Sequence, residues 1–228
     1  MSAPSRHGFT LIELSIVLVV IGLLVGGVLV GRDLIESGKV IKVGSQIREF
    51  ESAINLFRTK YNALPGDFAE ASSYWPDWMY ANNPTYMGNN NGMVDTNGEK
   101  ISFFRHLSLA GLIPGGYQSV TAHEKRPCIG YPCGPYDNSA YTVSSVNAPK
   151  EFILYALYAY GDYTFPLLTG KQAIVIDQKF DDGNPRSGRI QSRIGVYLDA
   201  SLTYSEACRY VYPMNDTPYC NLIFFIIR

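Results

Sequence analysis

The chain has 228 residues, of which 46% are hydrophobic and 17% are charged. Its 19 basic and 20 acidic residues leave a net charge of −1, which excludes a broad basic surface for nucleic acid and strong long-range steering. Because the net charge is close to zero, we expect protein partners and no nucleic acid. The length allows one soluble domain with a real core in addition to a membrane segment.

The N-terminus combines a short polar leader with a long apolar run. Residues 1–8 are polar and end in Arg-His-Gly, and the run from Phe9 to Gly31 contains Glu13 as its only ionisable side chain. At about 1.5 Å per residue, a helix of this length can just cross a bilayer core. A carboxylate there costs roughly 3 kcal/mol or more, so it marks a functional site with a cationic partner. A cut between Gly8 and Phe9 would free an α-amino group about one helical turn from Glu13.

These residues carry a resemblance to a known family. The string Gly8-Phe9-Thr10-Leu11-Ile12-Glu13-Leu14 resembles, position by position, the prepilin cleavage and methylation motif of type IV pilins and type II secretion pseudopilins. The resemblance implies that a prepilin peptidase cuts after Gly8 and methylates Phe9. It also implies that Glu13 pairs with the Phe9 amine of a neighbouring subunit as a filament grows. A plain signal anchor with a chance glutamate is the alternative interpretation.

The same resemblance implies partners and a location. The partners are other filament subunits, the prepilin peptidase, the inner-membrane assembly machinery and, before assembly, membrane lipid. The precursor is expected to be a single-pass protein of the bacterial inner membrane with its head in the periplasm. The assembled subunit is expected in a periplasmic or cell-surface filament.

The helix is predicted to continue beyond the membrane. In residues 32–62 apolar side chains recur at spacings of four and three, which indicates an amphipathic half of one helix of about 50 residues. Residues 62–66 end it, because proline disfavours helix at the preceding residue. We expect this half to lie on the head, although an intermolecular coiled coil is the alternative. The apolar positions are Val43, Ile47, Phe50, Ile54, Phe57 and Tyr61.

The head, residues 63–228, begins with irregular chain. Residues 74–97 predict a long ordered loop, whose aromatic residues either contact a partner such as a glycan or pack beneath the loop. Residues 101–113 predict a short helix that Gly111 and Pro114 stop. Leu64-Pro65-Gly66-Asp67-Phe68, the Asn/Gly-rich loop and the helix segment resemble a large group of bacterial prepilin-like proteins. The aromatic residues are Trp75, Trp78, Tyr80 and Tyr86.

The second half of the head predicts one more helix and a sheet. Thr169 to Gln172 has the spacing of a capping box, and apolar residues then recur on one face as far as Phe180, although a strand over 173–176 competes. Apolar and aromatic runs at 152–160, 194–198 and 222–227 predict strands. We therefore expect an α+β, pilin-like fold in which the long N-terminal helix packs on an antiparallel sheet.

Four cysteines and one loop are candidates for cross-links and metal. Disulfides are expected in a protein outside the cytoplasm, and pairing of sequence neighbours, Cys128–Cys133 and Cys208–Cys220, is the favoured one of three possible connectivities. A zinc site is the alternative, but the cysteine spacings fit no zinc finger. Asn89, Asn91 and Asp95 offer oxygen ligands that calcium prefers. The loop departs from the EF-hand pattern, and solvated turns are the favoured interpretation, so no cofactor is predicted apart from this calcium candidate.

The function that we expect is structural and not enzymatic. No nucleophile elbow, zinc-protease helix or phosphate loop is present around His106 and His123. The chain is therefore predicted to be a prepilin-type subunit of a type IV pilus or similar filament used in adhesion, motility or surface attachment. The alternatives are a type II secretion pseudopilin, a minor tip subunit, or a membrane-tethered, calcium-dependent binding module.

Overall fold

The computed structural model describes most of the long N-terminal helix and the core of the head. The described residues are 9–77, 86–115, 132–136, 139–145, 152–159, 168–184, 187–194 and 220–226. By its internal contacts the chain forms two compact units, residues 1–39 and 40–228. The boundary falls inside the predicted amphipathic segment, because the first buried residue of the helix is Val40.

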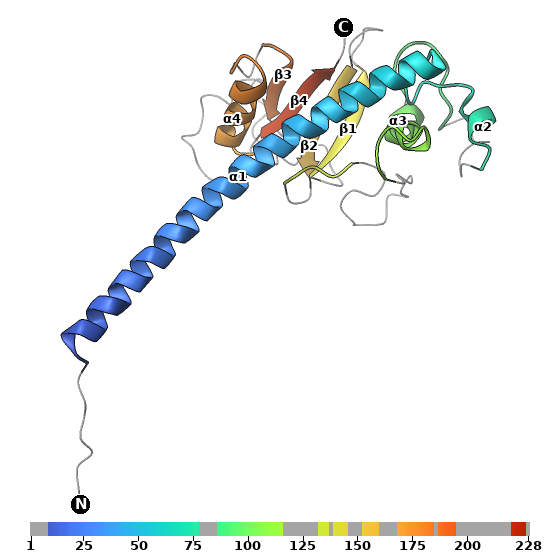
Figure 1. The fold of residues 1–228 in the computed structure, drawn as a ribbon. Coiled ribbons are helices and arrows are strands. Elements are labelled where there is room, and N and C mark those ends of the chain that lie inside the picture. Colours follow the sequence, from blue (N-terminus) through green and yellow to red (C-terminus); the bar gives the residue numbers. More distant parts are fainter. Residues whose placement is uncertain are drawn as a thin grey trace, which may run out of the picture. The chain divides into compact units, whose positions relative to one another are not determined.

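One unbroken helix, α1, runs from Leu11 to Tyr61, which confirms the predicted helix of about 50 residues (Figure 1). Its end is as expected, since Asn62 adopts a left-handed conformation with φ 49° just before the Leu64-Pro65 turn. The predicted stripe is also confirmed, because its first five members are buried and Tyr61 is partly buried against the same cluster. Packing on the head, and not a coiled coil, therefore accounts for the amphipathic pattern.

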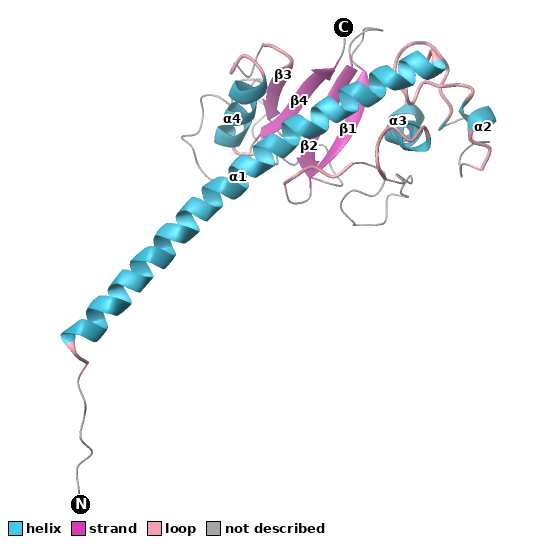
Figure 2. Cartoon of the chain, viewed as in Figure 1, coloured by secondary structure: helices cyan, strands magenta, loops and turns pink. Residues whose placement is uncertain are grey.

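Three further helices and four strands complete the described fold (Figure 2). The helices are α2 (Ala71–Tyr74), α3 (Asn97–Leu109) and α4 (Gly170–Phe180). The strands are β1 (Ser139–Ser145), β2 (Phe152–Ala159), β3 (Ile190–Ile194) and β4 (Cys220–Ile226). They form one antiparallel sheet in the order β1-β2-β4-β3, so the predicted α+β class is confirmed.

Both predicted short helices exist, and both begin at capping boxes. In α3, Thr96 accepts from the Glu99 N–H and the Glu99 side chain accepts from Thr96, so the helix begins four residues before the predicted Ile101. In α4, Thr169 and Gln172 make the same reciprocal pair, and the competing strand over 173–176 is wrong. The local caps therefore decide where these helices start.

The strand predictions are correct in part. Strands β2 and β4 lie within a residue or two of the predicted runs. Strand β3 includes Ile194, the first residue of the predicted run 194–198, and residues 195–198 lie outside the described residues. Strand β1 was not predicted. Its buried Tyr141 and Val143 alternate with polar residues, which is the period of a strand with one buried face.

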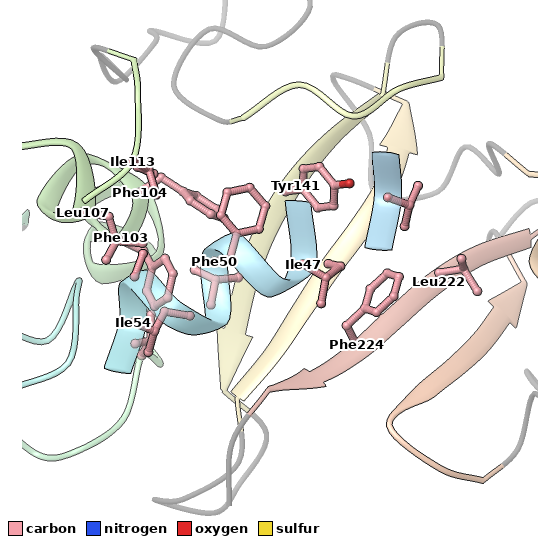
Figure 3. Close-up of a cluster of buried hydrophobic side chains, with 14 of the residues drawn as sticks. Ile47, Phe50, Ile54, Phe103, Phe104, Leu107, Ile113, Tyr141, Leu222 and Phe224 are labelled. Atoms are coloured by element: carbon pink, nitrogen blue, oxygen red, sulfur yellow. The ribbon is translucent and has the colours of Figure 1, made fainter. Parts of the chain in front are cut away.

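The core lies between α1, α3 and one face of the sheet (Figure 3). Phe50 of α1 is at its centre, with its ring centroid 5.4 Å from that of Phe104 and 5.1 Å from that of Tyr141. The Tyr141 hydroxyl donates to Gln46 Oε1 at 2.9 Å, which satisfies its polar atom. Within the 40–228 unit, α1 is thus fastened both to α3 and to the edge strand β1.

Candidate functional site

The first half of α1 exposes apolar side chains all around its surface. Every residue from Phe9 to Val30 is exposed, including Phe9 at 83% and Leu11 at 85%. By length and composition this helix can cross a membrane. A continuous apolar surface of this extent is not stable in water, so it must be covered by lipid or by neighbouring helices.

Glu13 lies at the start of this surface and helps to cap the N-terminus of α1. Its Oε2 accepts hydrogen bonds from the backbone N–H of Thr10 and from the Thr10 hydroxyl, both at 2.8 Å. In return, Thr10 Oγ1 accepts from the Glu13 N–H at 3.3 Å. This is the reciprocal geometry of a capping box, with Thr10 as the N-cap.

The capping box changes the chemistry expected of the carboxylate. The sequence predicts an external cation as the partner of Glu13, but two donors of its own chain already bind Oε2. No hydrogen bond to Oε1 is made by the residues that the structure describes, so this oxygen remains open to a second donor. Thr10 is the residue that sequence reasoning missed, and the Thr-x-x-Glu spacing was the signal that could have found it.

The predicted cleavage site lies between Gly8 and Phe9, where the described residues begin. Phe9 directly precedes the N-cap, and Gly8 lies outside the described residues. An amine created on Phe9 would therefore lie next to the capping box in the sequence. Cleavage and methylation at this position stay predictions.

The Asn/Gly loop, residues 86–96, uses its polar side chains to hold its own backbone. Asn89 Oδ1 accepts from the Asn91 N–H at 2.9 Å, and Asn91 Oδ1 accepts from the Met93 N–H at 2.8 Å. Asp95 Oδ2 accepts from the Asn91 side-chain amide at 3.4 Å. These are the oxygens that the calcium prediction offered as ligands, and each accepts a hydrogen bond within the loop. Calcium binding in this loop stays a prediction.

Asp67 fixes this loop to the start of the head. Its Oδ1 accepts from the N–H groups of Asn89 and Asn91 at 3.1 and 3.2 Å, and its Oδ2 accepts from the Gly92 N–H at 2.7 Å. Burial raises the pKa of Asp67, although these N–H groups oppose the shift. The two later motifs of the sequence, Leu64 to Phe68 and the Asn/Gly loop, are therefore one structural unit.

His106 belongs to the same unit and is completely buried. Its Nδ1 accepts from the Gly66 N–H at 3.0 Å, and its ring stacks on Phe57 at 6.2 Å. Complete burial, followed by the nearby charge of Arg105, lowers its pKa to about 3, so the ring is neutral at physiological pH. Gly66 is required here, since its φ is +88° and an added Cβ would lie 2.5 Å from the Glu99 carbonyl oxygen.

The aromatic residues of the predicted loop pack inward where they are described. Trp75 and Tyr86 are partly buried against the core, and the Trp75 ring centroid lies 5.7 Å from that of His106. Trp78 and Tyr80 lie outside the described residues. For the two described residues, packing beneath the loop is the correct interpretation.

Cys133 and Cys220 are both disulfide-bonded. Cys128 and Cys208 lie outside the described residues, so the predicted pairs Cys128–Cys133 and Cys208–Cys220 stay predictions. Cys220 begins β4, where it also pairs with Leu168 through backbone hydrogen bonds of 2.8 and 2.9 Å.

Comparison with known proteins supports the N-terminal assignment. A family model described as the prokaryotic N-terminal methylation motif matches residues 4–29. This motif is the hallmark of type IV pilins and pseudopilins. Comparison with curated proteins and with solved structures gives no significant match.

Proposed function

We propose that the chain is a prepilin-type structural subunit that assembles through α1 into a type IV pilus or pilus-like filament. The observation that carries the proposal is the methylation motif at residues 4–29, placed at the start of a helix whose apolar half is exposed on all sides. The precursor would be cleaved after Gly8 and methylated on Phe9 while it is anchored in the membrane, before assembly. Adhesion, motility or surface attachment would then be properties of the filament.

In this proposal the open oxygen of Glu13 receives the amine of a neighbouring subunit. Oε2 stays in the capping box, and Oε1 accepts from the methylated Phe9 amine. Two charges at membrane depth are costly when they are separate, and the cost is recovered when they meet. Correct axial register between subunits is what brings them together.

The capping box allows an experiment that separates two roles of Glu13. Glu13→Gln keeps the capping geometry, because glutamine also serves at this position, but it removes the charge. Glu13→Ala removes both. If pairing drives assembly, both variants insert into membranes normally and lose more than about tenfold in filament yield, since breaking a buried ion pair costs several kcal/mol.

The control is Glu49→Ala, which removes an exposed carboxylate farther along α1 and should leave filament yield unchanged. A wild-type filament yield from Glu13→Gln would contradict the ion pair and leave helix capping as the only role of Glu13.

Processing is tested separately, because Gly8→Ala should block cleavage. N-terminal sequencing of the purified wild-type protein should begin at Phe9, and a start before Phe9 would refute the cleavage site.

A further inference from the structure

Three carboxylates come together where α4 ends. Asp177 lies in the last turn of the helix, Asp181 is its C-cap, and Asp182 follows. One carboxylate oxygen from each residue lies within 4.8 Å of the other two. Calcium binds oxygen at about 2.3–2.6 Å, so ligands on opposite sides of the ion are roughly 4.6–5.2 Å apart. The three oxygens can therefore share one ion.

Asp177 is the buried member of the group. It is 1% exposed, and neither Oδ1 nor Oδ2 accepts a hydrogen bond from the part of the chain that the structure describes. Burial, followed by the charges of Asp182 and Asp181, raises its pKa to about 6, and the nearby Gly183 N–H offsets this only in part. Buried carboxylates are normally hydrogen-bonded, paired or bound to metal, so this side chain points to a ligand.

The other two carboxylates are held in fixed positions around it. Asp181 Oδ2 accepts from the Ile190 N–H at 2.6 Å. Asp182 accepts from the Asn184 N–H at 2.8 Å and from the Ser187 hydroxyl at 2.6 Å. Little further ordering would be needed for these groups to bind an ion, which favours binding.

Among the described residues no basic side chain pairs with this group, although Lys179 lies in the last turn of α4. No lysine or arginine there forms a salt bridge with any of the three carboxylates, and Arg189, on the following loop, is bound to Glu51. The C-terminal end of α4 adds a partial negative charge of its own. Three carboxylates and a helix terminus therefore repel one another unless a cation binds.

We propose that Asp177, Asp181 and Asp182 bind one calcium ion at the C-terminal end of α4. Hard oxygen ligands select Ca²⁺ or Mg²⁺, and three protein carboxylates exceed the one or two that Mg²⁺ usually takes. A bound ion ties the end of α4 to the loop that leads into β3. This site is separate from the Asn/Gly loop, and it does not depend on the filament role.

The test uses the full chain in detergent after removal of metal by a chelator. Equilibrium dialysis with radioactive calcium measures binding, and thermal unfolding measures the effect on the head. We expect one ion per wild-type chain and a higher melting temperature with calcium. Asp177→Asn and the exposed Asp182→Asn should each raise the dissociation constant at least about tenfold, since each removes a charged ligand.

Asp95→Asn is the matched control, because it removes a carboxylate from the Asn/Gly loop and should leave calcium binding unchanged. Loss of binding in Asp95→Asn but not in Asp177→Asn or Asp182→Asn would overturn the proposal in favour of that loop. Failure of the folded wild-type chain to bind at about 10 mM calcium, above the range of extracellular sites, would also overturn it. Equal displacement by equimolar magnesium would refute the assignment to calcium.

Discussion

Substitution of Gly44 by alanine tests how closely α4 approaches α1. Gly44 is buried in the middle of α1, and the Phe180 ring at the end of α4 lies directly against it. A Cβ built on Gly44 would lie 2.2 Å from Phe180 Cζ and 2.3 Å from Cε1. The guanidinium carbon of Arg48 is 5.6 Å from the centroid of the same ring, which favours the ring position.

The size of the effect follows from two opposing terms. An ordinary contact of a Cβ is 3.4–4 Å long, so the ring must move by more than an ångström. Overpacking of this kind costs about 1–3 kcal/mol. Alanine in place of glycine within a helix returns about 1 kcal/mol. Gly38→Ala measures the helix gain alone, because Gly38 lies in the same helix with nothing within 4 Å of the added Cβ.

The assay is thermal unfolding of the full chain in detergent, followed by near-ultraviolet circular dichroism of the head. Gly44→Ala should unfold at a lower temperature than Gly38→Ala, by roughly 2–4 °C for each kcal/mol in a domain of this size. In a Phe180→Ala background the penalty at Gly44 should disappear, because the clashing ring is gone. Equal melting temperatures for the two glycine variants, or a penalty that persists without the ring, would refute the packing.

Three further predictions concern polar groups. Thr10→Val removes the side-chain cap of α1, so amide exchange in the first turn should rise about fivefold, for a cost near 1 kcal/mol; unchanged exchange would argue against the cap. Asp67→Ala leaves the N–H groups of Asn89 and Gly92 without their acceptor, while the Asn91 N–H keeps Asn89 Oδ1, and should cost about 3 kcal/mol in chemical denaturation, whereas the exposed Asp77→Ala should not. The pKa of Asp177 is raised from 3.8 to about 6, so its favourable contribution is present below pH 4 and is lost as the pH rises through 6. In chelator, wild type should therefore lose up to about 3 kcal/mol more than Asp177→Asn between pH 4 and 7; parallel curves would contradict this.

The sequence predicts the regular elements of this fold well because local rules decide them. The apolar residues in 43–61 recur with the period of a helix that has one buried face, and α1 does bury these residues. Capping boxes mark the starts of α3 and α4, and only that at Thr169 was recognised beforehand. Glu99 lies three residues after Thr96, so the spacing of the second capping box is also a local signal.

The parts that were missed depend on contacts between distant residues. Asp67 fixes the Asn/Gly loop through backbone N–H groups 22 to 25 residues away, and no local pattern shows which carboxylate will do so. Asp177 lies on α4 as an ordinary polar residue by sequence, and only the fold buries it beside Asp181 and Asp182. For the candidate assembly site, the motif predicts Glu13 but not the hydrogen bonds that Thr10 makes to it.

The cap at the start of α1 bears on whether assembly can be reversed. Because Thr10 supplies both donors to Oε2, a lone subunit in the bilayer would, under the proposed function, keep its carboxylate hydrogen-bonded by its own chain. If a neighbour's amine adds at Oε1, no bond of the cap has to break for a subunit to join. The same bonds remain when a subunit leaves, so a filament built on this contact can return intact subunits to the lipid for another cycle.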